Sequence, residues 1–217
     1  MKAFVALEPS WSLEGFEPYI SGQTMLVHWG QLHQKYVKNL NDMLKKYPEL
    51  VEIPASEILR NPNAYFNDED DKMKYVNNMG GHFCHTLFWY CISPKPSKPP
   101  AELFKQLGTS QRELELKLKT QGLARFGSGW SWLALKHGNE LDCYSTQNHF
   151  TPFMKLHTPL LCVDLWEHAY FLDRFGNRQE WLDIILQYIA WQRVAQIYQG
   201  CIKGGKHPID NMLITNI

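Results

Sequence analysis

The sequence predicts an α+β protein in which an N-terminal antiparallel helical hairpin is followed by a C-terminal α/β domain with a small antiparallel sheet. Three observations lead to this fold class. Two long helical patterns fill most of the first 92 residues, four prolines stand within Ser93–Pro100, and alternating strand patterns appear only after them. A proline-rich stretch is stiff and extended and commonly separates domains. We therefore expect a hairpin domain over 1–92, a linker over 93–100 and an α+β domain over 101–217.

The two long helices are expected on either side of a connecting segment. Ser21 is a suitable N-cap for a helix that runs to about Lys46 and ends at Pro48. The connection contains a short helical pattern around Ala55–Arg60, and the second long helix covers about 70–92. Both long helices carry histidines and aromatic residues, so we expect their facing sides to form a core or a site.

Two local patterns on these helices bear on packing. His28, Leu32 and Tyr36 follow one another at intervals of four residues, so they share one face of an α-helix. Gly80 and Gly81 stand in mid-helix, where each costs about 1 kcal/mol relative to alanine. We interpret the glycine pair as a place where another backbone approaches the helix closely.

The segment after the prolines alternates between helical and strand patterns. Alternation of apolar and polar residues predicts strands, and the last long apolar stripe has helical spacing. The expected elements are helices at Ala101–Leu107 and Ser110–Leu123, strands at Phe126–Leu135 and Glu140–Thr146 joined by a turn at Lys136–Asn139, a short strand at Pro159–Asp164, and one final helix over Gln179–Gln199.

Composition excludes several classes of function. Lys+Arg and Asp+Glu number 22 each, so no net positive charge favours binding to nucleic acid or to an anionic membrane. No apolar run reaches the roughly 18 residues that a membrane span requires, and Glu8 and Pro9 interrupt the start before a signal-peptide core could form. The five cysteines are odd in number and scattered without a C-x-x-C pair, which is typical of reduced thiols in a cytoplasmic protein.

A carboxylate and an imidazole lie four residues apart within an apolar, aromatic run, at Asp164 and His168. Both groups are costly to bury without compensation. Asp164 could cap a following helix, or the two side chains could simply bond to each other, and a metal needs at least a third protein ligand. The two long helices each offer a histidine, His28 and His85. Three imidazoles and one carboxylate suit a redox-active metal such as iron or manganese.

These residues occur within segments that resemble a known family. From about Leu13 to Tyr198 the chain is similar to the iron/manganese superoxide dismutases. The segments that carry the resemblance, in family order, are Glu17–Ser21, His28-Trp29-Gly30, Lys35–Asn41, Gly80-Gly81-His82 leading to His85 and Phe88-Trp89, Gly127–Leu133, and Asp164-Leu165-Trp166-Glu167-His168-Ala169-Tyr170.

The resemblance implies a metal site and a reaction. It implies that His28, His85, Asp164 and His168 bind one metal ion, with a solvent molecule as fifth ligand. It also implies that the metal alternates between trivalent and divalent states. One superoxide is then oxidised to dioxygen, and the next is reduced, with two protons, to hydrogen peroxide. One iron per chain is our expectation, with manganese, or either metal, as the alternative.

The resemblance also assigns roles around the metal. Tyr36 matches a gateway tyrosine near the substrate channel, and Trp130 and Trp166, with Trp89 beside them, match an aromatic wall. Glu167 matches a glutamate that bonds across a dimer to the partner's metal-binding histidine. This implies a homodimer or homotetramer held through Glu167–His168 contacts. Arg178 matches an arginine near the channel mouth, where a cation would steer an anionic substrate.

One position bears on the metal. Some iron enzymes of the family carry a glutamine four residues before the second histidine ligand, where this chain has Gly81. The group that bonds the metal-bound solvent must therefore come from the C-terminal half, where Gln147 and His149 are the candidates. The local pattern favours His149, which follows Asn148. A histidine there leans toward iron or toward tolerance of both metals.

The chain departs from the family pattern at two linked positions. Leu32 and Phe171 replace a histidine and a tyrosine that bond across the dimer near the channel, so a polar pair is replaced by an apolar one. Replacing both partners is close to neutral for stability, but it puts proton delivery to the site in doubt.

The main alternative function is a catalytically silent structural or interaction protein of the same fold. A mononuclear iron oxygenase, whose site uses two histidines and one carboxylate, is the second.

Overall fold

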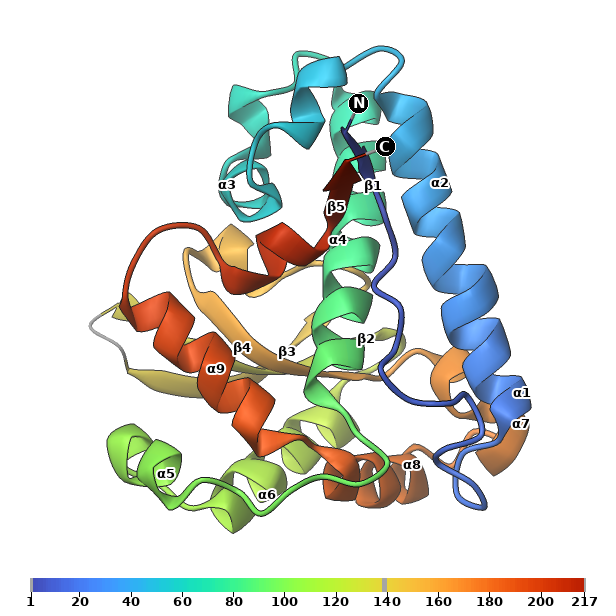
Figure 1. Ribbon diagram of the computed structural model, residues 1–217, viewed down its shortest axis with the longest axis vertical. Helices are drawn as coiled ribbons and strands as arrows, with labels where there is room; N and C mark the ends of the chain where they lie inside the picture. Colours follow the sequence, from blue (N-terminus) through green and yellow to red (C-terminus); the bar gives the residue numbers. More distant parts are fainter. Residues whose placement is uncertain (1, 138–139, 217) are drawn as a thin grey trace.

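Two long helices stand beside a small sheet that shorter helices cover (Figure 1). The computed structural model describes residues 2–137 and 140–216. A three-residue strand comes first, helices make up the rest of the first half, and the three-stranded sheet lies in the second half with helices before and after it. This arrangement confirms the predicted α+β class.

The first long helix is continuous but not uniform. It comprises α1 (Gly22–Met25), a π-helical segment (Leu26–His33) and α2 (Gln34–Met43), and the Ser21 hydroxyl caps its start by accepting from Thr24 N at 3.1 Å. A π-helix bonds residue i to i+5. The extra residue in the turn brings His33 as well as His28 to the buried side, while Leu32 is half-buried.

The second long helix is α4 (Glu69–Cys91), which packs along α2. Asp68 caps it by accepting from Asp71 N at 2.8 Å, and acidic residues fill its first turn, where the helix dipole favours them. The connection between the two helices contains the expected short helix, α3 (Ala55–Arg60). The helical hairpin therefore forms as predicted from the helical patterns.

The sheet has the order β3-β2-β4, and both pairings are antiparallel. β2 (Gly129–Leu135) is central and buried throughout, β3 (Leu141–Gln147) is an edge strand, and β4 (Thr158–Asp164) lies against α4. α5 (Ala101–Leu107) and α6 (Gln111–Ala124) precede the sheet, and α6 packs on β2 and β3. The turn predicted at Lys136–Asn139 includes residues 138–139, which lie outside the described part of the chain.

The predicted single helix over Gln179–Gln199 is wrong. The segment forms α8 (Arg178–Ile185) and α9 (Trp191–Ile202), separated by a 3-10 turn and by extended backbone at Ile189. There the chain pairs with the end of α4: Ile189 bridges Ile92, Ala190 N donates to Cys91 O at 2.8 Å, and Ser93 N donates to Tyr188 O at 2.9 Å. Tertiary hydrogen bonds thus outweigh a continuous apolar stripe.

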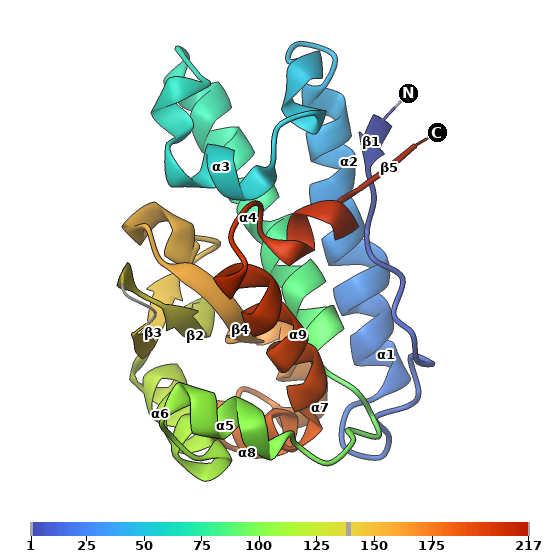
Figure 2. The same ribbon diagram turned by 60° about the vertical axis from the view of Figure 1, so that its left-hand side comes forward.

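The ends of the chain form a second sheet that the sequence analysis does not foresee. β1 (Lys2–Phe4) pairs antiparallel with β5 (Ile214–Asn216), so the two termini lie side by side against the helical hairpin (Figures 1 and 2). Three-residue strands are too short to show an alternating pattern. Within 2–137 and 140–216, no helix has the length and apolar character needed to cross a membrane.

Candidate metal centre

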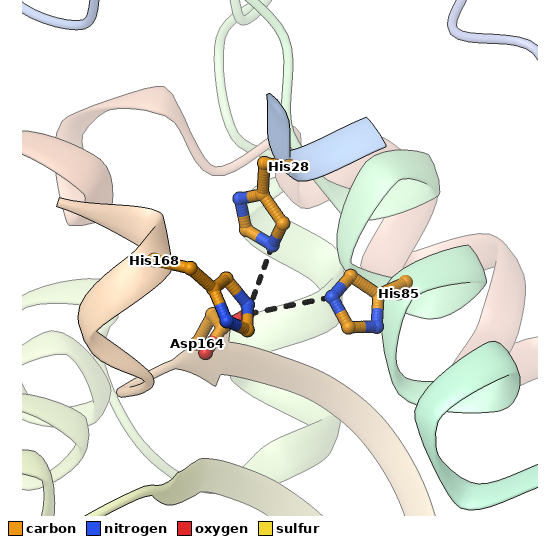
Figure 3. Close-up of side chains that lie close together, drawn as sticks. All are labelled: His28, His85, Asp164 and His168. Carbon is orange, nitrogen blue, oxygen red and sulfur yellow. Dashed lines mark hydrogen bonds and ion pairs between the residues drawn. The ribbon is translucent and has the colours of Figure 1, made fainter. Parts of the chain in front are cut away.

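Four side chains from four separate segments converge between the helical hairpin and the sheet. His28 lies in the π-helical segment, His85 in α4, Asp164 at the end of β4, and His168 in a 3-10 turn (Glu167–Ala169). One ligand atom from each lies within 4.8 Å of the others. Asp164 Oδ2 is 3.0 Å from His28 Nε2, 3.3 Å from His168 Nε2 and 3.7 Å from His85 Nε2. Figure 3 shows the four side chains pointing toward one another.

The hydrogen bonds around this cluster leave a nitrogen lone pair of His85 free toward its centre. His85 Nδ1 donates to Gly81 O at 2.6 Å, so its Nε2 carries no proton. Asp164 Oδ1 accepts from Trp166 N at 2.7 Å, which leaves Oδ2 facing the histidines. Nε2 of His85 and Nε2 of His168 are buried without any hydrogen-bond partner among the described residues. Buried unpartnered nitrogens beside a carboxylate fit a bound cation.

The protonation states also suit metal binding. Burial lowers the pKa of His28 to about 4 and holds that of His85 well below its ordinary value. Burial acts to raise the pKa of the Asp164 carboxyl, but His168 and His28 outweigh it and the pKa is lowered. Neutral imidazoles and an ionised carboxylate are the forms that metals require. At neutral pH the His28 and His85 imidazoles are therefore neutral and the Asp164 carboxyl is ionised.

A hydrogen-bonded group stands next to the cluster. Trp130 Nε1 donates to His149 Nδ1 at 3.2 Å, so the His149 proton is on Nε2, which donates to the Tyr36 hydroxyl at 2.8 Å. The His149 ring stacks on Trp166 with 4.6 Å between centroids and lies 5.9 Å from the ring of His85. Four predicted site residues are thus brought together here: Tyr36, Trp130, His149 and Trp166.

Of the two candidates near the end of β3, the structure brings His149 to the cluster and leaves Gln147 at the surface. His149 is buried, whereas Gln147 ends the edge strand with its side chain exposed. Asn148 between them has φ +50°, a left-handed conformation that asparagine tolerates better than most residues. This turn directs His149 inward.

The glycine pair of α4 makes room for these groups. A Cβ on Gly80 would lie 2.2 Å from the backbone oxygen of His149, and one on Gly81 would lie 2.9 Å from the Tyr36 ring. The interpretation that another backbone approaches the helix here is confirmed at Gly80. At Gly81 the neighbour is an aromatic ring instead.

The remaining predicted residues lie at the margin of the cluster. Glu167 is exposed, and the His168 side chain beside it is 17% exposed, unlike the other three members of the cluster. Arg178 donates to the backbone oxygens of Arg125, Gly127 and Leu165 and to the Tyr170 hydroxyl. Arg178 therefore holds together the segments that precede β2 and follow β4.

Two histidines at this centre were not singled out as site residues from the sequence. His33 and His82 are fully buried, and His33 stacks on His85 with 5.3 Å between centroids. His33 follows His28 by five residues, which places it elsewhere on an α-helix but on the same side of a π-helical turn. Only knowledge of the π-helical turn would have revealed it.

Comparison with known proteins agrees with this geometry. The description "iron/manganese superoxide dismutases, alpha-hairpin domain" matches residues 5–93, and "iron/manganese superoxide dismutases, C-terminal domain" matches residues 99–197. Superoxide dismutase (Mn) 2 of Bacillus anthracis is 35% identical over 211 residues, which cover 95% of this chain and 100% of that protein. Superoxide dismutase (Mn) of Thermus aquaticus is 35% identical over 197 residues, which cover 89% of this chain and 96% of the relative. The chain therefore belongs to the iron/manganese superoxide dismutase family.

Proposed function

We propose that this protein is a superoxide dismutase that converts superoxide to dioxygen and hydrogen peroxide at one metal ion held by His28, His85, Asp164 and His168. The observation that carries the proposal is the cluster itself. Three imidazole nitrogens surround one buried carboxylate oxygen, and two of those nitrogens have no hydrogen-bond partner within residues 2–137 and 140–216. Iron or manganese bound there supplies one-electron exchange between its divalent and trivalent states.

Tyr36 and His149 place a proton donor beside this site. The Tyr36 hydroxyl accepts from His149 Nε2, so its own proton is free to be donated toward substrate or solvent. Burial raises the pKa of Tyr36, which keeps that proton on the oxygen at neutral pH. Reduction of superoxide to hydrogen peroxide consumes two protons, and Tyr36 is placed to donate one of them.

The metal is iron or manganese, one ion per chain. Two observations favour different metals. His149 in the solvent-bonding position leads us to expect iron or tolerance of both, whereas the relatives named above are manganese enzymes. The four residues of the cluster are the same hard and borderline donors for either ion, so they do not discriminate by type.

We further propose that a second copy of the chain covers the face around Glu167, giving a homodimer or a homotetramer. In support, α7 (Phe171–Arg174) and the residue after it carry large exposed apolar side chains directly beyond the His168 turn, with Phe171 48% and Phe175 86% exposed. Exposed apolar patches of this kind mark interaction sites. Glu167 of one copy would then reach His168 of the other.

We also propose a cytoplasmic location. All five cysteines are free thiols, as expected where disulfides do not persist. The balanced charge gives no reason to include nucleic acid or a membrane among the partners.

The proposal is tested by metal content and superoxide consumption measured on one sample, purified from cells supplied with both iron and manganese. We expect about one iron or manganese per chain together with activity, and the ratio of the two ions identifies the preferred metal. A folded protein that contains neither metal and consumes no superoxide would favour the catalytically silent alternative.

A further inference from the structure

Two buried histidines beside the metal centre take no part in the proposed ligand set. His33 ends the π-helical segment and His82 lies in α4, and both side chains are fully buried. A buried imidazole is costly unless its polar nitrogens are bonded. Both nitrogens of both rings have partners, and these partners connect the metal centre to the C-terminal segment.

Trp89, His33, His82 and the carbonyl of Leu213 form a chain of hydrogen bonds in which donation can run in only one direction. Trp89 Nε1 donates to His33 Nδ1 at 3.1 Å, because an indole nitrogen can only donate. His33 therefore carries its proton on Nε2, which donates to His82 Nδ1 at 2.8 Å. His82 in turn is protonated on Nε2, which donates to Leu213 O at 3.2 Å. A carbonyl can only accept, so both ends of the chain require the same order of protons.

The head of this chain supports two of the proposed metal ligands. The Trp89 ring packs edge-on against His28, with 4.6 Å between centroids and 70° between planes. The His33 ring stacks on His85 at 5.3 Å and 22°. Rings held in place by directional hydrogen bonds restrict the rings they contact, and such outer contacts orient metal ligands.

The tail of the chain is anchored in the terminal sheet. Leu213 precedes β5, and its carbonyl also accepts from Val5 N at 2.9 Å. Both lone pairs of this oxygen are thus used by groups from α4 and from the N-terminal segment. Because the chain ends on a backbone carbonyl, it offers no route for a proton to leave, which excludes a proton relay to solvent.

We propose that His33 and His82 are positioning residues, and that the Trp89–His33–His82–Leu213 chain holds the rings of His28 and His85 in place for the metal. The inference rests on the proposed function, because it assumes that these histidines bind an ion. It assigns to the paired termini a role in keeping the metal bound, although they lie at the surface of the hairpin.

Neutron diffraction from deuterated crystals of the metal-loaded full chain tests the order of protons directly. We expect deuterium on Nε2 and none on Nδ1 in both His33 and His82. Deuterium on Nδ1 of either ring would overturn the inference, whatever the metal content or the activity of the protein.

Two substitutions at one position test the positioning role. In His82→Asn the amide oxygen occupies the place of Nδ1 and still accepts from His33, whereas in His82→Gln that acceptor is lost. We expect His82→Gln to release its metal to a chelator about 10-fold faster than the unaltered protein and to shift the visible absorption of the oxidised ion. His82→Asn keeps the acceptor for His33 but loses the bond to Leu213 O, so we expect it to release its metal more slowly than His82→Gln and faster than the unaltered protein.

His207 provides the matched control. It is also a buried histidine of the same tautomer, accepting from Ile209 N at 3.2 Å and donating to Pro159 O at 2.8 Å, and it contacts none of the four metal-binding residues in the described structure. His207→Gln should lower the melting temperature without accelerating metal release. Equal release rates in the two His82 variants, or an equal acceleration in His207→Gln, would contradict a positioning role. Absence of metal from the unaltered protein would instead overturn the proposed function.

Discussion

Two hydrogen-bond chains flank the histidines of the proposed metal centre, and they differ in how they end. Each begins at a buried indole: Trp130 donates to His149, and Trp89 donates to His33. The first chain ends at the half-buried Tyr36 hydroxyl, whose own proton remains free. The second ends at the carbonyl of Leu213, which has no proton to give.

The comparison shows that the terminal group decides what a buried imidazole can do. A tryptophan at the head fixes the tautomer in both cases, because its nitrogen only donates. The first chain, which we call the open chain, ends at a hydroxyl whose proton is free, and this suits proton delivery. The second, which we call the closed chain, ends at a carbonyl oxygen that already accepts two hydrogen bonds, and this suits a positioning role. In the roles proposed above, histidine therefore serves proton delivery on one side of the centre and positioning on the other.

The largest effect should come from removing the group that lies between the two chains. Asp164→Asn keeps an oxygen that can accept from Trp166 N but removes the negative charge that faces three imidazoles. We expect the purified variant to contain almost no iron or manganese and to lose its activity. Asp142→Asn, which removes an equal charge from a surface ion pair with Lys136, is the control and should retain both. Full metal content in Asp164→Asn would contradict the ligand assignment.

Acid should weaken both chains, because each needs a neutral imidazole. Burial lowers the pKa of His82 and of His149 to about 4 from an ordinary 6.5. The unfolded chain therefore binds protons first, so the stability is complete above pH 6.5 and is lost as the pH falls toward 4. The loss amounts to about 3 kcal/mol for each such histidine.

Urea unfolding of the metal-free full chain at a series of pH values measures this loss. Replacing His82 by Asn should make the free energy of unfolding less dependent on pH between 6.5 and 4. An unchanged pH dependence in that variant would show that His82 is not held neutral.

A smaller effect should follow from a substitution that forces the His149 backbone, and so only the open chain, to move. In Gly80→Ala the new methyl group would lie 2.2 Å from the His149 backbone oxygen, so the turn that carries His149 must shift. We expect the free energy of unfolding to fall by about 2 kcal/mol and the activity to decrease. In Gly30→Ala the nearest atom is the flexible end of Leu26 at 3.3 Å, and this control should unfold at nearly the same urea concentration as the parent.

The smallest effect should come from removing only the Tyr36 hydroxyl, which ends the open chain. Tyr36→Phe keeps the ring against Gly81 but deletes the hydroxyl that accepts from His149. We expect the rate of superoxide consumption to fall about 10-fold with unchanged metal content.

The Trp89→Phe variant removes the indole donor at the start of the closed chain and should change metal retention more than turnover. If both variants altered the same quantity to the same degree, the distinction between the chains would be wrong.

Sequence patterns predicted those parts of the fold that local spacing controls. The hairpin helices, the three strands of the sheet and the Ser21 cap follow from periodicity and residue preference. The break at Ile189 could not be predicted, because it results from pairing with Ile92, nearly a hundred positions away. The pairing of the termini could not be predicted either, because β1 and β5 lie at opposite ends of the chain.

The site was predictable where residues matched a family pattern and not where backbone geometry decided. Resemblance identified the four residues that converge, and the local pattern favoured His149 over Gln147, but the inward direction of His149 depends on the left-handed conformation of Asn148. The role of His33 depended on a π-helical turn, since five-residue spacing places it with His28 only in that geometry. Local conformations of this kind leave little trace in residue type.

The most direct test is anomalous diffraction from crystals of the purified protein, recorded at the iron and manganese absorption edges. We expect one peak per chain, within bonding reach of Asp164 Oδ2 and of Nε2 of His28, His85 and His168, at one edge or at both. The edge at which the peak appears identifies the ion. A crystal that shows no peak among these four atoms, from protein that consumes superoxide, would contradict the assignment of the metal centre.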